Sequence, residues 1–153
     1  MAIEEKLKKM KINIPKAPKP VASYVPFRRV DNLIYISGQD CRINGKLKFE
    51  GKVGKEVTEE EAYEAARITA INLIAILKSA IGDLDKVVKI VNLHGYVNSA
   101  EGFVRQPMVI NGASDLLLEI FGEAGKHSRC ALSMNELPFN TPVEIEMIVE
   151  VKA

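Results

Sequence analysis

The segment 143–152 alternates between apolar and polar side chains, and it constrains the fold more than any other part of the sequence. A period of two is typical of a β-strand that buries one face and leaves the other polar. The polar face would carry two carboxylates, Glu144 and Glu146. The buried face would carry the apolar set Val143, Ile145, Met147, Val149 and Val151.

Helical and extended patterns follow one another through the rest of the chain. Thr58 and Glu61 form a capping box, which predicts a helix over about 58–80 that stops at Gly82. A second helix is expected over 109–121. Strands are expected over 24–30, 33–37, 43–50, 87–97, 129–134 and 143–151. This order predicts an α/β (α+β) domain in which two helices cover one face of a mixed sheet.

The first residues, 1–19, are predicted to form a helical arm outside a single domain that spans 20–153. Apolar residues recur at helical spacing along the arm, and three prolines follow them and end the helix. The arm is basic, so it could contact nucleic acid, but a docked amphipathic helix with a solvated lysine face explains the pattern better. The apolar stripe consists of Ile3, Leu7, Met10 and Ile14.

Composition narrows the class of protein. With 153 residues, 47% of them apolar, the chain has the size and make-up of one globular domain. No apolar run is long enough to span a membrane, and no leader pattern precedes the domain. Cys41 and Cys130 are too few for a disulfide framework, so we expect a reducing, cytoplasmic environment. His94 and His127 lack further ligands at suitable spacing, so no metal is predicted.

The expected order of elements leaves one face of the sheet without a helical layer. A single domain of this length offers no third layer to cover it. Exposed apolar surface of that kind is a feature of interaction sites. Association with further copies of the same chain is the simplest way to cover the face, so we predict a homo-oligomer.

Arg129 and Glu144 stand 15 residues apart, on either side of the turn 137–142. Two strands joined by this turn are predicted to hold the guanidinium and the carboxylate near one another at a sheet surface. Such a pair could clamp an anionic substrate and direct a water onto it. By pattern alone, both residues have an ordinary interpretation as surface side chains. His127, close before the arginine, is a candidate for tuning the clamp.

Several short motifs, in order and with similar spacing, resemble the RidA/YjgF family of small imine deaminases. They are Tyr24-Val25, Ser37-Gly38-Gln39, Arg129, Leu137-Pro138 and the run 143–146. The resemblance covers about residues 20–152. It implies a chorismate-mutase-like fold, assembled as a homotrimer around a central β-barrel, with one cleft at each subunit interface.

The resemblance also implies a function, the hydrolysis of a 2-iminoacid to a 2-ketoacid and ammonia without metal or organic cofactor. Arg129 would bind the substrate carboxylate, and Glu144 would hold and deprotonate the attacking water. The other substrate-binding residues implied are Tyr24, Ser37, Gly38 and Asn111, the last being the nearest counterpart of a family asparagine. The segment 100–127 is longer than in typical imine deaminases and is expected to shape the pocket.

Two other classes of function stay open at this stage. A non-catalytic trimer that binds small carboxylates would need the same arginine. An RNA-directed endoribonuclease or translation inhibitor is suggested by other names of the family. The sequence shows neither a basic groove with interleaved aromatic residues nor a histidine pair for acid–base cleavage, which argues against nucleic acid as a partner.

Overall fold

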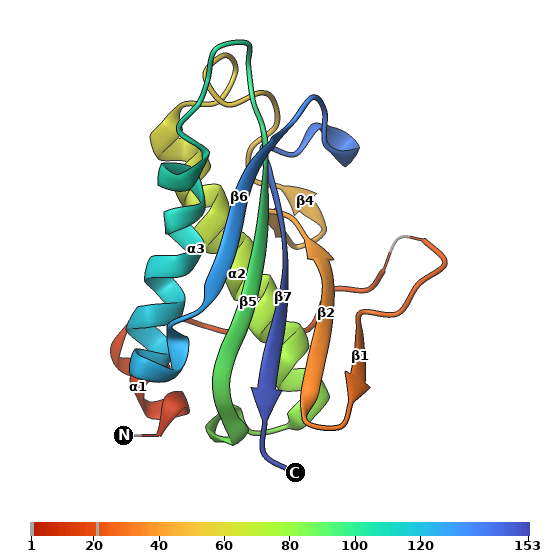
Figure 1. The fold of residues 1–153 in the computed structure, drawn as a ribbon, viewed down its shortest axis with the longest axis vertical. Coiled ribbons are helices and arrows are strands. Elements are labelled where there is room, and N and C mark those ends of the chain that lie inside the picture. Colours follow the sequence, from red (N-terminus) through yellow and green to blue (C-terminus); the bar gives the residue numbers. More distant parts are fainter. Residues whose placement is uncertain (1, 21) are drawn as a thin grey trace.

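A five-stranded mixed sheet forms the centre of the molecule (Figure 1). The computed structural model describes residues 2–20 and 22–153. The strand order is β1-β2-β7-β5-β6, in which β5 and β6 run parallel and the other neighbours run antiparallel. The strands are β1 Phe27–Val30, β2 Leu33–Gln39, β5 Val87–Asn98, β6 Ser128–Met134 and β7 Val143–Val151, with a separate hairpin of β3 Arg42–Ile43 and β4 Lys46–Leu47.

Both long helices lie on one side of this sheet, as predicted (Figure 1). Helix α2 packs on β2 and β7, and helix α3 packs on β5 and β6. The helices are α1 Ile3–Lys9, α2 Glu59–Ile81 and α3 Gln106–Phe121, with short 3-10 turns η1 Leu84–Lys86, η2 Gly122–Gly125 and η3 Pro138–Asn140. In the part of the chain that the structure describes, no helix is both long and apolar enough to cross a membrane.

Strand β7 confirms the period of two. Its five apolar side chains, at the odd positions from 143 to 151, are at most 2% exposed and face the helices. The even positions, which include Glu144 and Glu146, are half-buried and face the opposite side of the sheet. No described helix covers that side, which we call the open face. The open face carries exposed apolar side chains such as Tyr35 and Leu132.

The capping box at the start of α2 is present with both of its hydrogen bonds. The Glu61 amide donates to Thr58 Oγ1 over 3.1 Å, and the Thr58 amide donates to Glu61 Oε1 over 3.2 Å. The helix stops at Gly82, whose φ of 79° is costly for a residue with a side chain. The predicted helix is therefore confirmed to within one residue at each end.

Several predicted boundaries were wrong. The expected strand 43–50 is instead the short hairpin of β3 and β4, which ends at Leu47. Helix α1 ends at Lys9, well before the prolines, because Lys11 takes a φ of 58° and the Ile12 amide turns back to the Leu7 carbonyl. Helix α3 starts three residues earlier than expected, since Pro107 fits a first helical turn. Strand β1 starts at Phe27 rather than Tyr24.

The N-terminal arm is docked, as its apolar stripe predicted. Leu7 is 2% exposed, and the Ile3 amide donates to Asp85 Oδ1 over 2.8 Å. Lys78 on α2 pairs with Glu4 over 2.8 Å. Because these contacts join the arm to the helical layer, the arm lies away from the open face (Figure 1).

Helices α2 and α3 approach closely because α3 carries Gly112 at their crossing. A β-carbon at this position would lie 2.0 Å from the Tyr63 carbonyl oxygen of α2. On an exposed helix, Gly→Ala stabilises by roughly 1 kcal/mol. Here the added methyl group meets backbone that cannot move without separating the helices.

We therefore expect Gly112→Ala to lower the free energy of unfolding by about 1–3 kcal/mol, the cost of overpacking. Urea denaturation measures this change, with Glu119→Ala on the exposed side of α3 as a control for helix propensity. A Gly112→Ala variant as stable as the native chain would show that the helix contact is looser than described.

Candidate functional site

Arg129 lies on the helical side of the sheet. In β6 it is aligned with Leu93 of β5, which is fully buried beneath the helices. Its guanidinium reaches α3, where Nη1 donates to Ser114 Oγ over 3.0 Å and Nη2 donates to the Pro107 carbonyl over 3.2 Å. The guanidinium is partly exposed at the edge of the sheet, because β6 is the last strand.

Glu144 lies on the open face, so the predicted proximity of the pair within one chain was wrong. In β7 it is aligned with Tyr96 of β5, and its neighbours Val143 and Ile145 are fully buried on the other side. Strand β5 also separates β6 from β7. The turn 137–142 does not join adjacent strands, which is why spacing in the sequence failed to predict the distance between the two side chains.

The Glu144 carboxylate packs over Gly38, so these two residues are neighbours in the fold. A β-carbon on residue 38 would lie 3.1 Å from Glu144 Oε2, so glycine provides the space for the carboxylate. The pairing of β2 with β7 shifts between Ile36 and Gln39, and this irregularity brings the glycine backbone to the carboxylate.

Burial raises the pKa of Glu144 above its ordinary value, and the nearby charges of Asp40 and Glu146 raise it further. A carboxyl group with a raised pKa holds a proton more readily and is a stronger base when ionised. Both properties suit a group that takes a proton from water and returns it to a leaving group. Among the predicted residues, Glu144 therefore has the environment best suited to acid–base chemistry.

A cavity of about 510 Å³ opens on the same face beside Glu146. His94 Nδ1 lies 3.0 Å from Glu146 Oε1, and the Tyr96 hydroxyl donates to the same oxygen over 3.1 Å. Burial raises the pKa of Tyr96, and the hydrogen bond to Glu146 adds to the shift. Tyr24, Ser37 and Arg28 also line the cavity. No motif in the sequence predicted this network, although the period of two in 92–98 places His94 and Tyr96 on one face.

The hydroxyl of Ser37 has only one proton, and that proton is already engaged. It donates to the Val25 carbonyl over 2.7 Å, and the Ser37 amide donates to the Pro26 carbonyl over 2.9 Å. These bonds tie β2 to the segment that carries Tyr24, whose side chain is 46% exposed. In this arrangement Ser37 Oγ accepts a hydrogen bond from a ligand but does not donate one.

A chain of hydrogen bonds orients Arg129 on α3. His127 Nδ1–H donates to the Gly125 carbonyl at 2.7 Å, so in the neutral ring Nε2 accepts from Ser114 Oγ at 2.9 Å, while Ser114 Oγ itself accepts from Arg129. We assign this neutral tautomer from the hydrogen-bond pattern. His127 therefore acts on the arginine through Ser114. Asn111, one turn before Ser114, is half-buried on the same side of α3.

The predicted site residues thus form two groups in one chain. Tyr24, Ser37, Gly38 and Glu144 lie together on or beside the open face. Arg129 and Asn111 lie on the helical side, at the edge formed by β6 and α3. One chain alone does not bring the carboxylate and the guanidinium to a common ligand.

Glu144 is expected to lower the stability of the fold at neutral pH. Because its pKa is raised, folding favours the protonated form, and this contribution is lost as pH rises through the folded-state pKa. We expect Glu144→Gln to raise the urea midpoint at about pH 8, with a gain that shrinks as the pH falls toward about 4. Glu136→Gln, at an exposed position, is the control. A gain independent of pH would contradict the burial of an ionised Glu144.

Comparison with known proteins supports the fold. Residues 4–151 match the family described as "YjgF/chorismate mutase-like, putative endoribonuclease". Protein TCP17 of Trypanosoma cruzi is 37% identical over 145 residues, which cover 94% of this chain and 91% of TCP17. The crystal structure of Atu1372 from Agrobacterium tumefaciens, a protein of unknown function, has a TM-score of 0.91 at 42% identity and covers 99% of this chain and 93% of Atu1372.

A third relative carries the name of an activity. The 2-iminobutanoate/2-iminopropanoate deaminase of Dermatophagoides farinae is 28% identical over 141 residues, which cover 92% of this chain and 95% of that protein. The family match spans nearly the whole chain, and the mixed sheet with helices on one face is the fold that the motifs predicted. The chain therefore belongs to the YjgF/chorismate mutase-like family.

Proposed function

We propose that the chain is a hydrolytic deaminase of 2-iminoacids that works as a homotrimer with its sites between subunits. The observation that carries the proposal is Glu144, a half-buried carboxylate of raised pKa that packs over Gly38 on a sheet face without a helical cover. The deaminase name of the Dermatophagoides farinae relative supports the reaction class.

The separation of the two key groups supports a site between subunits. Arg129 lies at the β6 edge on the helical side, whereas Glu144 lies on the open face. When the open face of one subunit meets the β6 edge of the next, a carboxylate and a guanidinium from different chains come to one cleft. Repeating this heterologous contact around a closed ring places one such cleft at every interface, as in a trimer.

The guanidinium of Arg129 is prepared to bind a carboxylate. Its two terminal nitrogens each carry two hydrogens, and each donates once within the chain, to Ser114 and to Pro107. The remaining hydrogens can bind the two oxygens of a substrate carboxylate, a match that lysine does not provide. Ser37 Oγ, which accepts but does not donate, suits the N–H of the substrate iminium group.

Glu144 would then perform the proton transfers. As the water oxygen bonds to the carbon of the C=N group, Glu144 takes a proton from the water and a tetrahedral amino alcohol forms. Glu144 returns that proton to the nitrogen, the C–N bond breaks, and ammonia leaves. The hydroxyl group passes its proton to the ionised Glu144 as the new carbonyl forms, which yields the 2-ketoacid. Glu144 then gives this proton to the departing ammonia, which leaves as ammonium and returns Glu144 to its starting form. The raised pKa of Glu144 suits both directions of transfer.

We expect Glu144→Gln to lower the turnover of 2-aminoacrylate, generated in situ and followed as pyruvate release, by about 100-fold or more. The amide is nearly isosteric but does not take up a proton at neutral pH, so the affinity for 2-oxobutanoate, measured by calorimetry, should stay within about threefold. Glu150→Gln, on the same face of the same strand, is the matched control and should leave turnover unchanged.

Each outcome of this assay has a defined meaning. Turnover by Glu144→Gln at the native rate would refute the role of Glu144. If the native chain binds 2-oxobutanoate without accelerating pyruvate release, the protein is a carboxylate binder rather than an enzyme. Cleavage of single-stranded RNA by the native chain, in place of imine hydrolysis, would favour the endoribonuclease alternative that the family description names.

A further inference from the structure

A second cavity, of about 690 Å³, opens between the β3–β4 hairpin and the turn η3. It is larger than the open-face cavity, and neither Glu144 nor Arg129 lines it. The deaminase proposal therefore leaves it unused. The chemically distinctive residues of its wall are Arg42, Lys46, Lys48, Glu50 and Phe139.

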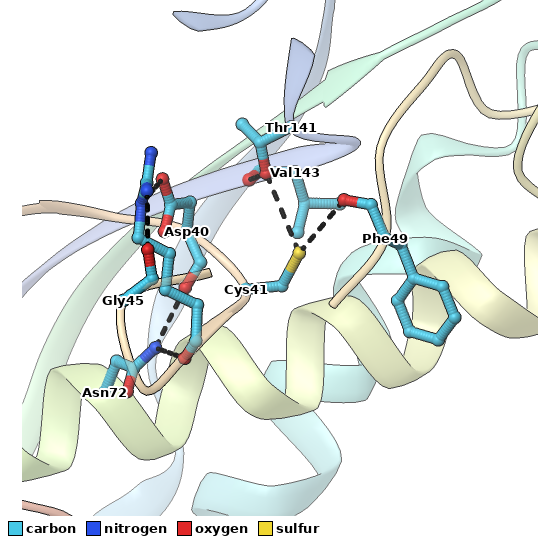
Figure 2. Close-up of polar contacts among 8 residues, drawn as sticks. Asp40, Cys41, Gly45, Phe49, Asn72, Thr141 and Val143 are labelled. Carbon is cyan, nitrogen blue, oxygen red and sulfur yellow. Dashed lines mark hydrogen bonds and ion pairs between the residues drawn. The ribbon is translucent and has the colours of Figure 1, made fainter. Parts of the chain in front are cut away.

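The base of the hairpin is fixed to the rest of the fold (Figure 2). Asn72, which is 6% exposed, reaches from α2 and donates to the Asp40 carbonyl over 3.0 Å and to the Arg42 carbonyl over 2.9 Å. Between them the Cys41 side chain is fully buried, with its sulfur 3.8 Å from Thr141 Oγ1. One wall of the cavity is therefore held in place before any ligand arrives.

The Arg42 guanidinium is held in one position at this wall. Its Nε donates to Asp40 Oδ2 over 3.1 Å, and its Nη1 donates to the Gly45 carbonyl over 3.1 Å. Its central carbon lies 4.9 Å from the centre of the Phe139 ring, which is a cation–π contact. Nη2 makes no hydrogen bond to any of the described residues, and the side chain is 26% exposed. The fixed Arg42 guanidinium therefore keeps the N–H groups of Nη2 for hydrogen bonds to a ligand.

Phe139 occupies an unfavourable backbone conformation. Its φ is 58° and its ψ is 16°, a left-handed region that bulky side chains rarely adopt, and Asn140 follows with a φ of 60°. The fully buried Asn98 holds the turn, because its amide donates to Asn140 Oδ1 over 3.1 Å and to the Thr141 carbonyl over 3.2 Å.

Phe139 is 62% exposed, so burial of its side chain contributes little free energy to offset the backbone strain. Backbone strain of this kind collects at ligand-binding positions, where the surrounding structure maintains it. Asparagine or glycine would fit the left-handed conformation better than phenylalanine. The ring contacts the Arg42 guanidinium, and its large exposed fraction leaves further aromatic surface on which a ligand can stack.

The charges around the ring favour an anion. Arg42, Lys46 and Lys48 contribute three positive charges to the wall, whereas Glu50 and the Arg42 partner Asp40 contribute two negative charges, so one positive charge remains in excess. Both lysine side chains are exposed, so they reach a ligand without the cost of breaking buried contacts. We propose that this cavity, which we call the Phe139 cleft, binds a small organic anion that carries an aromatic ring. The proposal is independent of the deaminase activity.

Three probes separate the two parts of the proposed ligand. 2-Naphthoate has both ring and negative charge, 2-naphthamide keeps the ring without the charge, and acetate keeps the charge without the ring. Calorimetry on the native chain should show saturable binding of 2-naphthoate, with the other two probes weaker by about tenfold or more. Absence of saturable 2-naphthoate binding, or equal binding of 2-naphthamide, would overturn the proposal.

Substitutions test whether 2-naphthoate binds in the Phe139 cleft. Phe139→Asn removes the ring and suits the left-handed backbone, so it should weaken 2-naphthoate binding about tenfold without lowering the urea midpoint. The double change Lys46→Ala and Lys48→Ala should weaken binding similarly, whereas Lys9→Ala, on the exposed side of α1, should not. Binding that survives Phe139→Asn but is lost in Arg129→Lys would put the probe at the other site and overturn the proposal.

Discussion

The packing of β7 between β2 and β5 is the constraint on which the rest of the structure depends. Its odd side chains are fully buried against the helices, so its even side chains must lie on the other face of the sheet. A shift of one residue would bury Glu144 and expose five apolar side chains. The same alternation that stabilises the core therefore fixes the carboxylate on the open face, away from Arg129.

The environment of Glu144 shows how the fold keeps a carboxylate reactive. Gly38 provides space for the side chain, and partial burial together with the neighbouring acids Asp40 and Glu146 raises its pKa. Asp40 in turn pairs with Arg42 over 3.1 Å. The charge of Asp40 thus acts on both Glu144 of the open face and Arg42 of the Phe139 cleft, although the two cavities are separate.

Local patterns predicted most of the fold. The capping box at Thr58, the stop at Gly82 and the period of two at 143–151 are local signals. Each depends only on neighbouring residues, and each predicted the right element. The uncovered face of the sheet followed from counting the elements. Boundaries near the N-terminus were wrong because the sequence did not reveal the left-handed turn at Lys11, which ends α1 before the prolines.

The site was harder to predict because it depends on strand register. In β6 the burial alternates only weakly, and the parallel pairing of Arg129 with Leu93 sets the face of the arginine. The contacts of His94 with Glu146, and of Ser114 with His127, join residues from different elements. No pattern along the sequence encodes these pairings, whereas the family motifs selected Gly38 and Glu144, which the fold brings together.

Activity of mixed trimers tests the central claim, a site shared by two subunits, most directly. Arg129→Lys and Glu144→Gln subunits, each nearly inactive alone, are unfolded together in equal amounts and refolded. If the site lies between subunits, some interfaces join an intact Arg129 to an intact Glu144, and deaminase activity should return to about a quarter of the native value. Activity that stays at the level of the separate variants would contradict a shared site.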